Sequence, residues 1–190
     1  MLSAGEDFFI FTLYNREITY LENVSIKCYT SNIFLEKGKY KLMNDKKLTE
    51  EEAQQLLTML KVTLQEELIF PTKGKSEEFE VEGNLKKELF AVKIFRGSIN
   101  NKKYNFGARI LKKGILLLEL HINPSNVHIN PDGTKIKGSH WHIYTERYGR
   151  TFAIEAEDIE DSKFVENTII FLNKFNVIKR PNVIYQEEII

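Results

Sequence analysis

The chain has 190 residues, 42% of them hydrophobic, and its 27 Lys and Arg residues balance its 27 Asp and Glu residues. This length and composition suit one compact domain with a small appendage, and no apolar run is long enough to cross a membrane. A single cysteine, Cys28, excludes an internal disulfide, so we expect a protein of the reducing cytoplasm.

Charge is distributed unevenly along this neutral chain. Residues 86–151 carry 13 Lys and Arg against 4 Asp and Glu, and they contain all four histidines. A positive field of this kind attracts phosphates or acidic partners. The alternative is that the acidic flanking segments fold over the basic segment and neutralise it.

The N-terminal part is predicted to be β-rich and the next segment to be a helix. Residues 8–43 are rich in aromatic and β-branched residues and predict a β-meander. Thr49 and Glu52 form the Thr-x-x-Glu pattern of a capping box, and apolar residues follow at helical spacing. We therefore expect an N-terminal β-rich extension at residues 1–47, a main domain at residues 48–190, and a helix at 49–66.

The basic segment is predicted to contain strands at 89–95, 104–111 and 115–122. The last two form a hairpin around Lys112-Lys113-Gly114, a three-residue loop with glycine in the left-handed position. In that register one face is wholly apolar. We expect this register because a buried apolar face specifies how two strands pair. Its residues are Tyr104, Phe106, Ala108, Ile110, Leu116, Leu118, Leu120 and Ile122; the opposite face carries Asn105, Gly107, Arg109, Glu119 and His121.

A further strand is predicted at 140–148, with one buried and one polar side. Trp141 and Ile143 alternate with His140, His142, Tyr144, Glu146 and Tyr148, so the histidines should face away from the core. Another strand at 151–154 and a last helix at 161–174, capped by Asp161 or Ser162, follow. The fold class we expect is α+β: an antiparallel sheet packed by two helices, with an N-terminal β-meander.

The histidines permit a metal site. His140 and His142 are two residues apart on a strand, so both imidazoles can reach one Zn²⁺ or another divalent metal. The proposed ligand set is His128, Asp132, His140 and His142, with Glu146 and His121 as further candidates. The alternative is structural: Asn130-Pro131-Asp132-Gly133 is a strong turn signal, and a lone strand histidine such as His121 is usually a hydrogen-bonded structural residue.

Two other interpretations of the same residues remain open. Metal-free RNA cleavage needs an acid, a base and a cation, and the candidate catalytic residues are His140, His142, Tyr144 and Glu146. The candidate nucleic-acid or phosphate contacts are Arg96, Arg109, Arg147 and Arg150. The same polar, aromatic face could instead bind without chemistry, by stacking bases, holding phosphates or docking on a protein.

The histidine motif resembles that of an uncharacterised prokaryotic family. The pattern is H-x-N-P-D-G at 128–133 followed by H-x-H-I-Y-x-E-x-Y-G at 140–149. The resemblance covers about residues 48–190. The family resembles a domain of unknown function from bacterial chromosomes, prophages and plasmids. It implies no activity. Residues 1–47 have no counterpart in it, and the family tends to carry an acid where this chain has His121.

These observations lead to three functional hypotheses. The first is a cytoplasmic accessory protein, encoded by a phage or mobile element, that acts on RNA or DNA or on a nucleic-acid-handling protein through the histidine, tyrosine and arginine face, with no membrane contact. The second is an enzyme, either a ribonuclease-like toxin or a metal-dependent hydrolase using His140 and His142. The third is a phage counter-defence inhibitor that acts by protein contact alone.

Overall fold

The computed structural model describes residues 47–100 and 102–185, with the backbone of four short strands nearer the N-terminus. The chain divides into two compact units, Met1–Lys47 and Leu48–Ile190. In the first unit, β1 (Ile18–Tyr20) pairs with β2 (Val24–Ile26), and β3 (Ile33–Glu36) pairs with β4 (Lys39–Leu42), both antiparallel. Residues 8–17 of the expected β-meander, and Cys28, lie outside the described residues.

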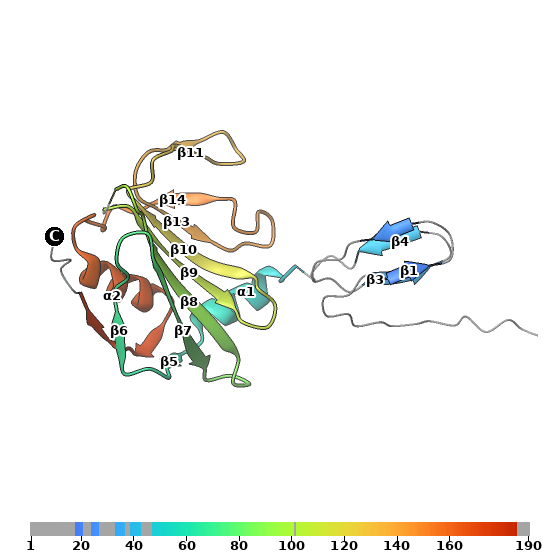
Figure 1. Ribbon diagram of the computed structural model, residues 1–190, viewed down its shortest axis with the longest axis horizontal. Helices are drawn as coiled ribbons and strands as arrows, with labels where there is room; N and C mark the ends of the chain where they lie inside the picture. Colours follow the sequence, from blue (N-terminus) through green and yellow to red (C-terminus); the bar gives the residue numbers. More distant parts are fainter. Residues whose placement is uncertain are drawn as a thin grey trace, which may run out of the picture. The chain divides into compact units, whose positions relative to one another are not determined.

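An eight-stranded sheet dominates the second unit (Figure 1). Its order is β14-β13-β10-β9-β8-β7-β5-β15, and every neighbouring pair is antiparallel except β15 and β5. This confirms the predicted α+β class. The strands are β5 (Lys61–Thr63), β7 (Ser76–Gly83), β8 (Leu89–Arg96), β9 (Tyr104–Ile110), β10 (Leu116–Ile122), β13 (His140–Ile143), β14 (Ala153–Glu155) and β15 (Val177–Lys179).

Two small strand pairs flank this sheet. β6 (Glu67–Ile69) pairs in parallel with β16 (Asn182–Ile184), and β11 (His128–Ile129) pairs antiparallel with β12 (Lys135–Ile136). The β11–β12 hairpin is closed by the predicted Asn130–Gly133 turn, in which Gly133 N donates to Asn130 O at 2.9 Å. Gly133 has a φ of +88°, a conformation that glycine adopts without strain.

Both helices, α1 (Glu50–Thr58) and α2 (Phe164–Lys174), pack on one face of the sheet (Figure 1). Phe171 of α2 stacks on Phe106 of β9 and on Trp141 of β13, with ring centroids 5.1 and 6.0 Å apart. The predicted apolar sides of β9 and β13 therefore meet the core, and the opposite face of the sheet is left for polar residues. That opposite face carries the histidines.

Helix α1 begins as predicted and ends earlier than predicted. The capping box is present: Glu52 N donates to Thr49 Oγ1, and Thr49 N donates to a Glu52 carboxylate oxygen. The helix stops at Thr58, so its predicted extent to residue 66 was wrong. The reason is tertiary, because residues 61–63 form β5 between β7 and β15.

Lys61 is a buried cation that joins the ends of both helices. Its ammonium donates to the carbonyl oxygens of Leu57, Met59 and Phe175 at 2.9 to 3.0 Å and lies 4.2 Å from the Phe175 ring centroid. Burial lowers the pKa of Lys61 to about 7, while three acceptors match the three N–H groups of an ammonium. Lys61 thereby satisfies carbonyls that a helix end leaves unpaired.

We expect Lys61→Met to lower the free energy of unfolding by about 2 kcal/mol, since buried carbonyls without donors are costly. Methionine keeps most of the side-chain volume, so the loss reports the hydrogen bonds. Urea denaturation against the exposed control Lys179→Met measures it. Equal stability of the two variants would contradict this role.

Helix α2 begins later than predicted, and its buried face includes polar residues. Lys163, not Asp161 or Ser162, is the N-cap. Asn167 is buried because its amide donates to the Tyr104 hydroxyl and to Glu160 O, both at 2.6 Å. Ile169, although apolar, is 37% exposed and lies outside this buried face.

The β9–β10 hairpin has the predicted register, with one irregularity. Ala108 lies opposite Leu118 and Tyr104 lies opposite Ile122. Between Leu116 and Leu118 the register shifts, so Leu116 lies opposite Arg109. The assignment of Leu116 to the apolar face was therefore wrong, because a bulge turns its side chain to the other side of the sheet; an added Cβ on Gly107 would lie 3.3 Å from it.

Strand β13 is shorter than predicted. It ends at Ile143, where Tyr144 N bonds to Leu117 O beside the irregularity in β10. A turn closed by the Thr145–Gly149 bridge replaces the rest of the expected strand. The prediction of one continuous face from 140 to 148 was wrong.

Among the described residues, no helix is long and apolar enough to span a membrane.

Candidate metal centre

All four histidines of the chain meet on the face of the sheet opposite the helices. The rings of His121 and His142 have centroids 4.8 Å apart, as do those of His128 and His142. His140 lies 5.0 to 5.2 Å from the other three. We call His121, His128, His140 and His142 the histidine cluster.

Strand register brings the cluster together. Strand β10 pairs with β13 so that His121 lies opposite His140 and Glu119 lies opposite His142. Directly opposed side chains in an antiparallel pair are about 5 Å apart at Cβ. The sequence places Glu119 and His121 on the polar face of one strand, and His140 and His142 on the polar face of another. It carries no signal that β10 and β13 are neighbours. Glu119 was therefore missed as a site residue, and His121 was expected to be structural.

The β11–β12 hairpin supplies the fourth histidine. His128 Nε2 lies 3.1 Å from Asn130 Oδ1 and 3.2 Å from Thr151 O. Asn130 is buried and joins the hairpin to β14, because its amide accepts from Ala153 N and donates to Ala153 O. His128 is therefore positioned by the Asn of the motif.

The hydrogen bonds indicate which ring nitrogens are available to bind an ion. His140 Nδ1 donates to Gly138 O at 2.8 Å, which leaves its Nε2 with a lone pair. His142 Nδ1 is buried and has no hydrogen-bond partner within the described part of the chain. Potential ligand atoms of His121, His140 and His142 all lie within 4.8 Å of one another. An orphaned buried nitrogen in such a group indicates a missing partner.

Glu119 stands beside the cluster as a buried carboxylate. One of its oxygens lies 3.8 Å from His121 Nε2, and Arg150 lies 3.2 Å from the other. Burial acts to raise the pKa of Glu119, but the neighbouring His121 and the charge of Arg150 together hold it below its usual value. A carboxylate next to a ligand histidine fixes the orientation of the ring.

Burial also keeps two imidazoles neutral. It lowers the pKa of His140, and it lowers the pKa of His142 to about 4, with the neighbouring histidines adding to the effect. Neutral imidazole is the form that binds metal ions.

We expect the metal-free protein to lose stability in mild acid. Because the folded-state pKa of His142 lies below its unfolded value of 6.5, the unfolded state takes up the proton first. The stabilisation is complete above pH 6.5 and is lost as pH falls through 4, for a total of about 3 kcal/mol. Urea denaturation in EDTA at pH 6.5 and at pH 4 measures this loss of stability. The His142→Gln variant serves as the reference for the other titrating groups. The same pH dependence in that variant would contradict the assignment.

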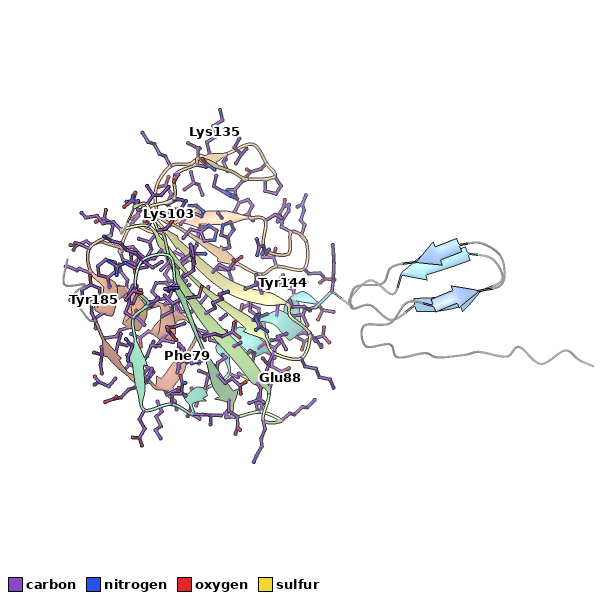
Figure 2. All side chains as sticks on the ribbon, in the orientation of Figure 1. Phe79, Glu88, Lys103, Lys135, Tyr144 and Tyr185 are labelled. Atoms are coloured by element: carbon purple, nitrogen blue, oxygen red, sulfur yellow. The ribbon has the colours of Figure 1, made fainter. Side chains whose placement is uncertain are left out.

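The structure does not bring three other proposed site residues into the cluster. The Tyr144 hydroxyl accepts from Leu48 N at 3.1 Å and lies in the core, beside α1 in Figure 2. Glu146 exchanges hydrogen bonds with Glu50, each backbone N–H donating to the other's carboxylate. The Asp132 carboxylate accepts from Thr134 N and Oγ1 in the exposed turn, which lowers its pKa. The contacts of Tyr144 and Glu146 tie the turn after β13 to the start of helix α1.

The four candidate phosphate-binding arginines are dispersed. Arg96 is 2% exposed, packs against the Phe164 and Tyr185 rings and donates to Pro71 O. Arg109 pairs with Glu78 at 2.8 Å, Arg150 pairs with Glu119, and Arg147 lies over the Tyr148 ring. The burial of Arg96 removes it from any surface that a ligand can reach.

Fold and site together define a histidine-lined centre on one face of a mainly antiparallel sheet whose other face is covered by two helices. The chain belongs to a family of unknown function, DUF6978, whose model matches residues 48–177. This confirms the expected membership of an uncharacterised family. No curated protein and no solved structure shows a significant match to this chain.

Proposed function

We propose that this chain is a metal-dependent hydrolase whose divalent ion, of the zinc class, is bound by His121, His140 and His142. The observation that carries the proposal is the convergence of their ligand atoms within 4.8 Å, with a buried and unpartnered His142 Nδ1. Clustered imidazoles favour zinc and its neighbours over magnesium or calcium, which prefer oxygen ligands.

Three protein ligands are the number that hydrolytic zinc sites use. Three histidine ligands would leave a coordination position for water, and a bound zinc-class ion would supply a water whose pKa is lowered to about 7. His128 stands next to this group, held by Asn130 and Thr151, where it is placed to orient a reacting group. Glu119 is a positioning residue, because it contacts His121 rather than the centre of the group.

Access supports a reaction site rather than a closed structural one. A hollow of about 380 Å³ opens beside the cluster, and His121, His128 and His140 form part of its wall. A substrate held there would lie directly against three of the four imidazoles.

The test is hydrolysis of a chromogenic phosphodiester and a chromogenic carboxylic ester by protein loaded with Zn²⁺, Mn²⁺ or Co²⁺. We expect turnover that EDTA abolishes, that His142→Ala lacks and that Asp132→Ala keeps. Glu119→Gln should weaken metal affinity by about 10- to 100-fold, the usual effect of a lost partner behind a ligand histidine. Metal-loaded protein that hydrolyses neither substrate would contradict the hydrolase.

The other expectations stay predictions. A phage or mobile-element origin, a toxin activity and a counter-defence role by protein contact have no support from the geometry. A cytoplasmic location remains part of the proposal, supported by the single cysteine of the sequence.

A further inference from the structure

A second hollow adjoins the first on the same face of the sheet. It has a volume of about 350 Å³ and is bordered by Lys93, Gly107, Arg109 and Glu119. Phe95 and Asn105 line both hollows, so the two form one groove across strands β8, β9 and β10, with the histidine cluster at one end. We call these two hollows the sheet groove.

Gly107 and the bulge in β10 shape the groove. Gly107 has no side chain to fill the floor, and a Cβ there would meet only Leu116 and Glu119, at 3.3 and 3.8 Å. Leu116, turned to this face by the bulge, provides an apolar wall. The hollow therefore follows from a glycine in a strand interior, a position where glycine often marks the approach of a ligand.

The lining combines an exposed aromatic ring with cations. Phe95 is 38% exposed where the two hollows meet. Lys93 is exposed in the second hollow, and Lys103, hydrogen-bonded to Ser125 at its tip, lies in the first. Arg109 adds a third cation, partly offset by Glu78. An exposed ring flanked by cations is the chemistry that binds single-stranded nucleic acid, by base stacking and phosphate contact.

We propose that the sheet groove binds a single-stranded oligonucleotide and directs it to the histidine cluster. A base would stack on Phe95, and Lys93 and Lys103 would contact phosphates on either side. From β8 to β13 the site spans three strand spacings, or about 14 Å. That length exceeds the roughly 3.4 Å per nucleotide of a stacked strand, so the groove accommodates several nucleotides. Cleavage of the bound strand rests on the proposed metal centre, whereas binding does not.

Single strands fit this surface better than duplexes do. Phe95 can stack only on a base that is not already stacked on both sides within a helix. We therefore expect the protein to bind a single strand more tightly than a duplex.

The experiment measures fluorescence anisotropy of labelled oligo(dT) and oligo(U), each about ten nucleotides long, within the usual site sizes. Full-length protein is used in EDTA, so that binding is scored without the metal. Phe95→Ala should weaken binding about tenfold. Lys93→Ala and Lys103→Ala should each reduce the salt slope of log K by about 0.7, a change that a purely structural role would not cause.

Gly107→Val tests the groove without removing a charge. Valine suits a strand and its Cβ meets only side-chain atoms, so we expect a folded protein with a filled hollow and weakened binding. Matched controls are Ile99→Ala, at a fully exposed residue, and Lys113→Ala, in the β9–β10 turn; both should bind as the wild type does.

The outcomes distinguish this inference from the metal centre. Oligonucleotide binding that His142→Ala retains and Gly107→Val loses supports the groove, whatever the metal result. Absence of binding at low salt, equal or tighter binding of a duplex, or competition by a mononucleotide as effective as by the oligomer would each overturn the inference. A metal-binding protein with any of those three results would keep its proposed hydrolase centre and lose the oligonucleotide.

Discussion

His142→Ala is expected to weaken Zn²⁺ binding by about a hundredfold or more. His142 contributes the buried nitrogen that has no protein partner among the described residues, and its ring is within 5.0 Å of all three other histidine rings, centroid to centroid. Loss of a residue behind a ligand already costs 10- to 100-fold, so loss of a ligand should cost at least as much. Competition with a chromogenic chelator at pH 7 measures the affinity.

Asp132→Ala is the matched control for that variant. Asp132 belongs to the same sequence motif and was itself a candidate ligand, but its carboxylate caps the exposed turn through Thr134. We expect its metal affinity to equal that of the wild type. If Asp132→Ala lost the metal and His142→Ala kept it, the assignment of ligands from the geometry would be wrong.

Asn130→Ala is expected to lower the free energy of unfolding by about 3 kcal/mol. Asn130 is buried and its side chain makes hydrogen bonds to Ala153 N, Ala153 O, Thr134 and His128. Alanine leaves the N–H and C=O of Ala153 unpaired inside the protein, and each such group costs about 1–3 kcal/mol. Thermal and urea unfolding measure the loss.

The same substitution should also loosen the cluster, because His128 loses one of its two hydrogen-bond acceptors. Asn126→Ala, at an exposed position in the segment before β11, is the control and should change neither stability nor metal affinity. Wild-type stability of Asn130→Ala would contradict the view that this asparagine joins the hairpin to β14.

Local signals in the sequence predicted the elements whose geometry is decided locally. The capping box at Thr49 and Glu52 needs only four residues, and the β9–β10 register needs only a loop type and an alternating pattern; both are confirmed. The orientation of Trp141 toward the core follows from the same alternation. Such features depend on neighbours within a few positions along the chain.

Features that depend on distant segments could not be predicted. Helix α1 ends early because β5 fits between β7 and β15, more than a hundred residues separating it from β15. Tyr144 leaves the histidine face because β13 stops beside a bulge in β10. Arg96 is buried under Phe164 and Tyr185, both near the end of the chain.

The spacing of the histidine motif has two structural explanations. His128, His140 and His142 enter the cluster, with Asn130 holding the first of them. Tyr144 and Glu146 instead bind the start of helix α1 through its backbone N–H groups. One half of the motif builds the centre, and the other fastens the supporting strand to the helix layer.

The most direct test of the metal centre is the metal content of untagged protein by plasma mass spectrometry, since a histidine tag would itself bind metal. We predict a single zinc-class ion per chain in the wild type and in Asp132→Ala, and its loss from His142→Ala. Wild-type protein that is free of metal, and that remains so after incubation with Zn²⁺ and gel filtration, would contradict the proposed metal centre.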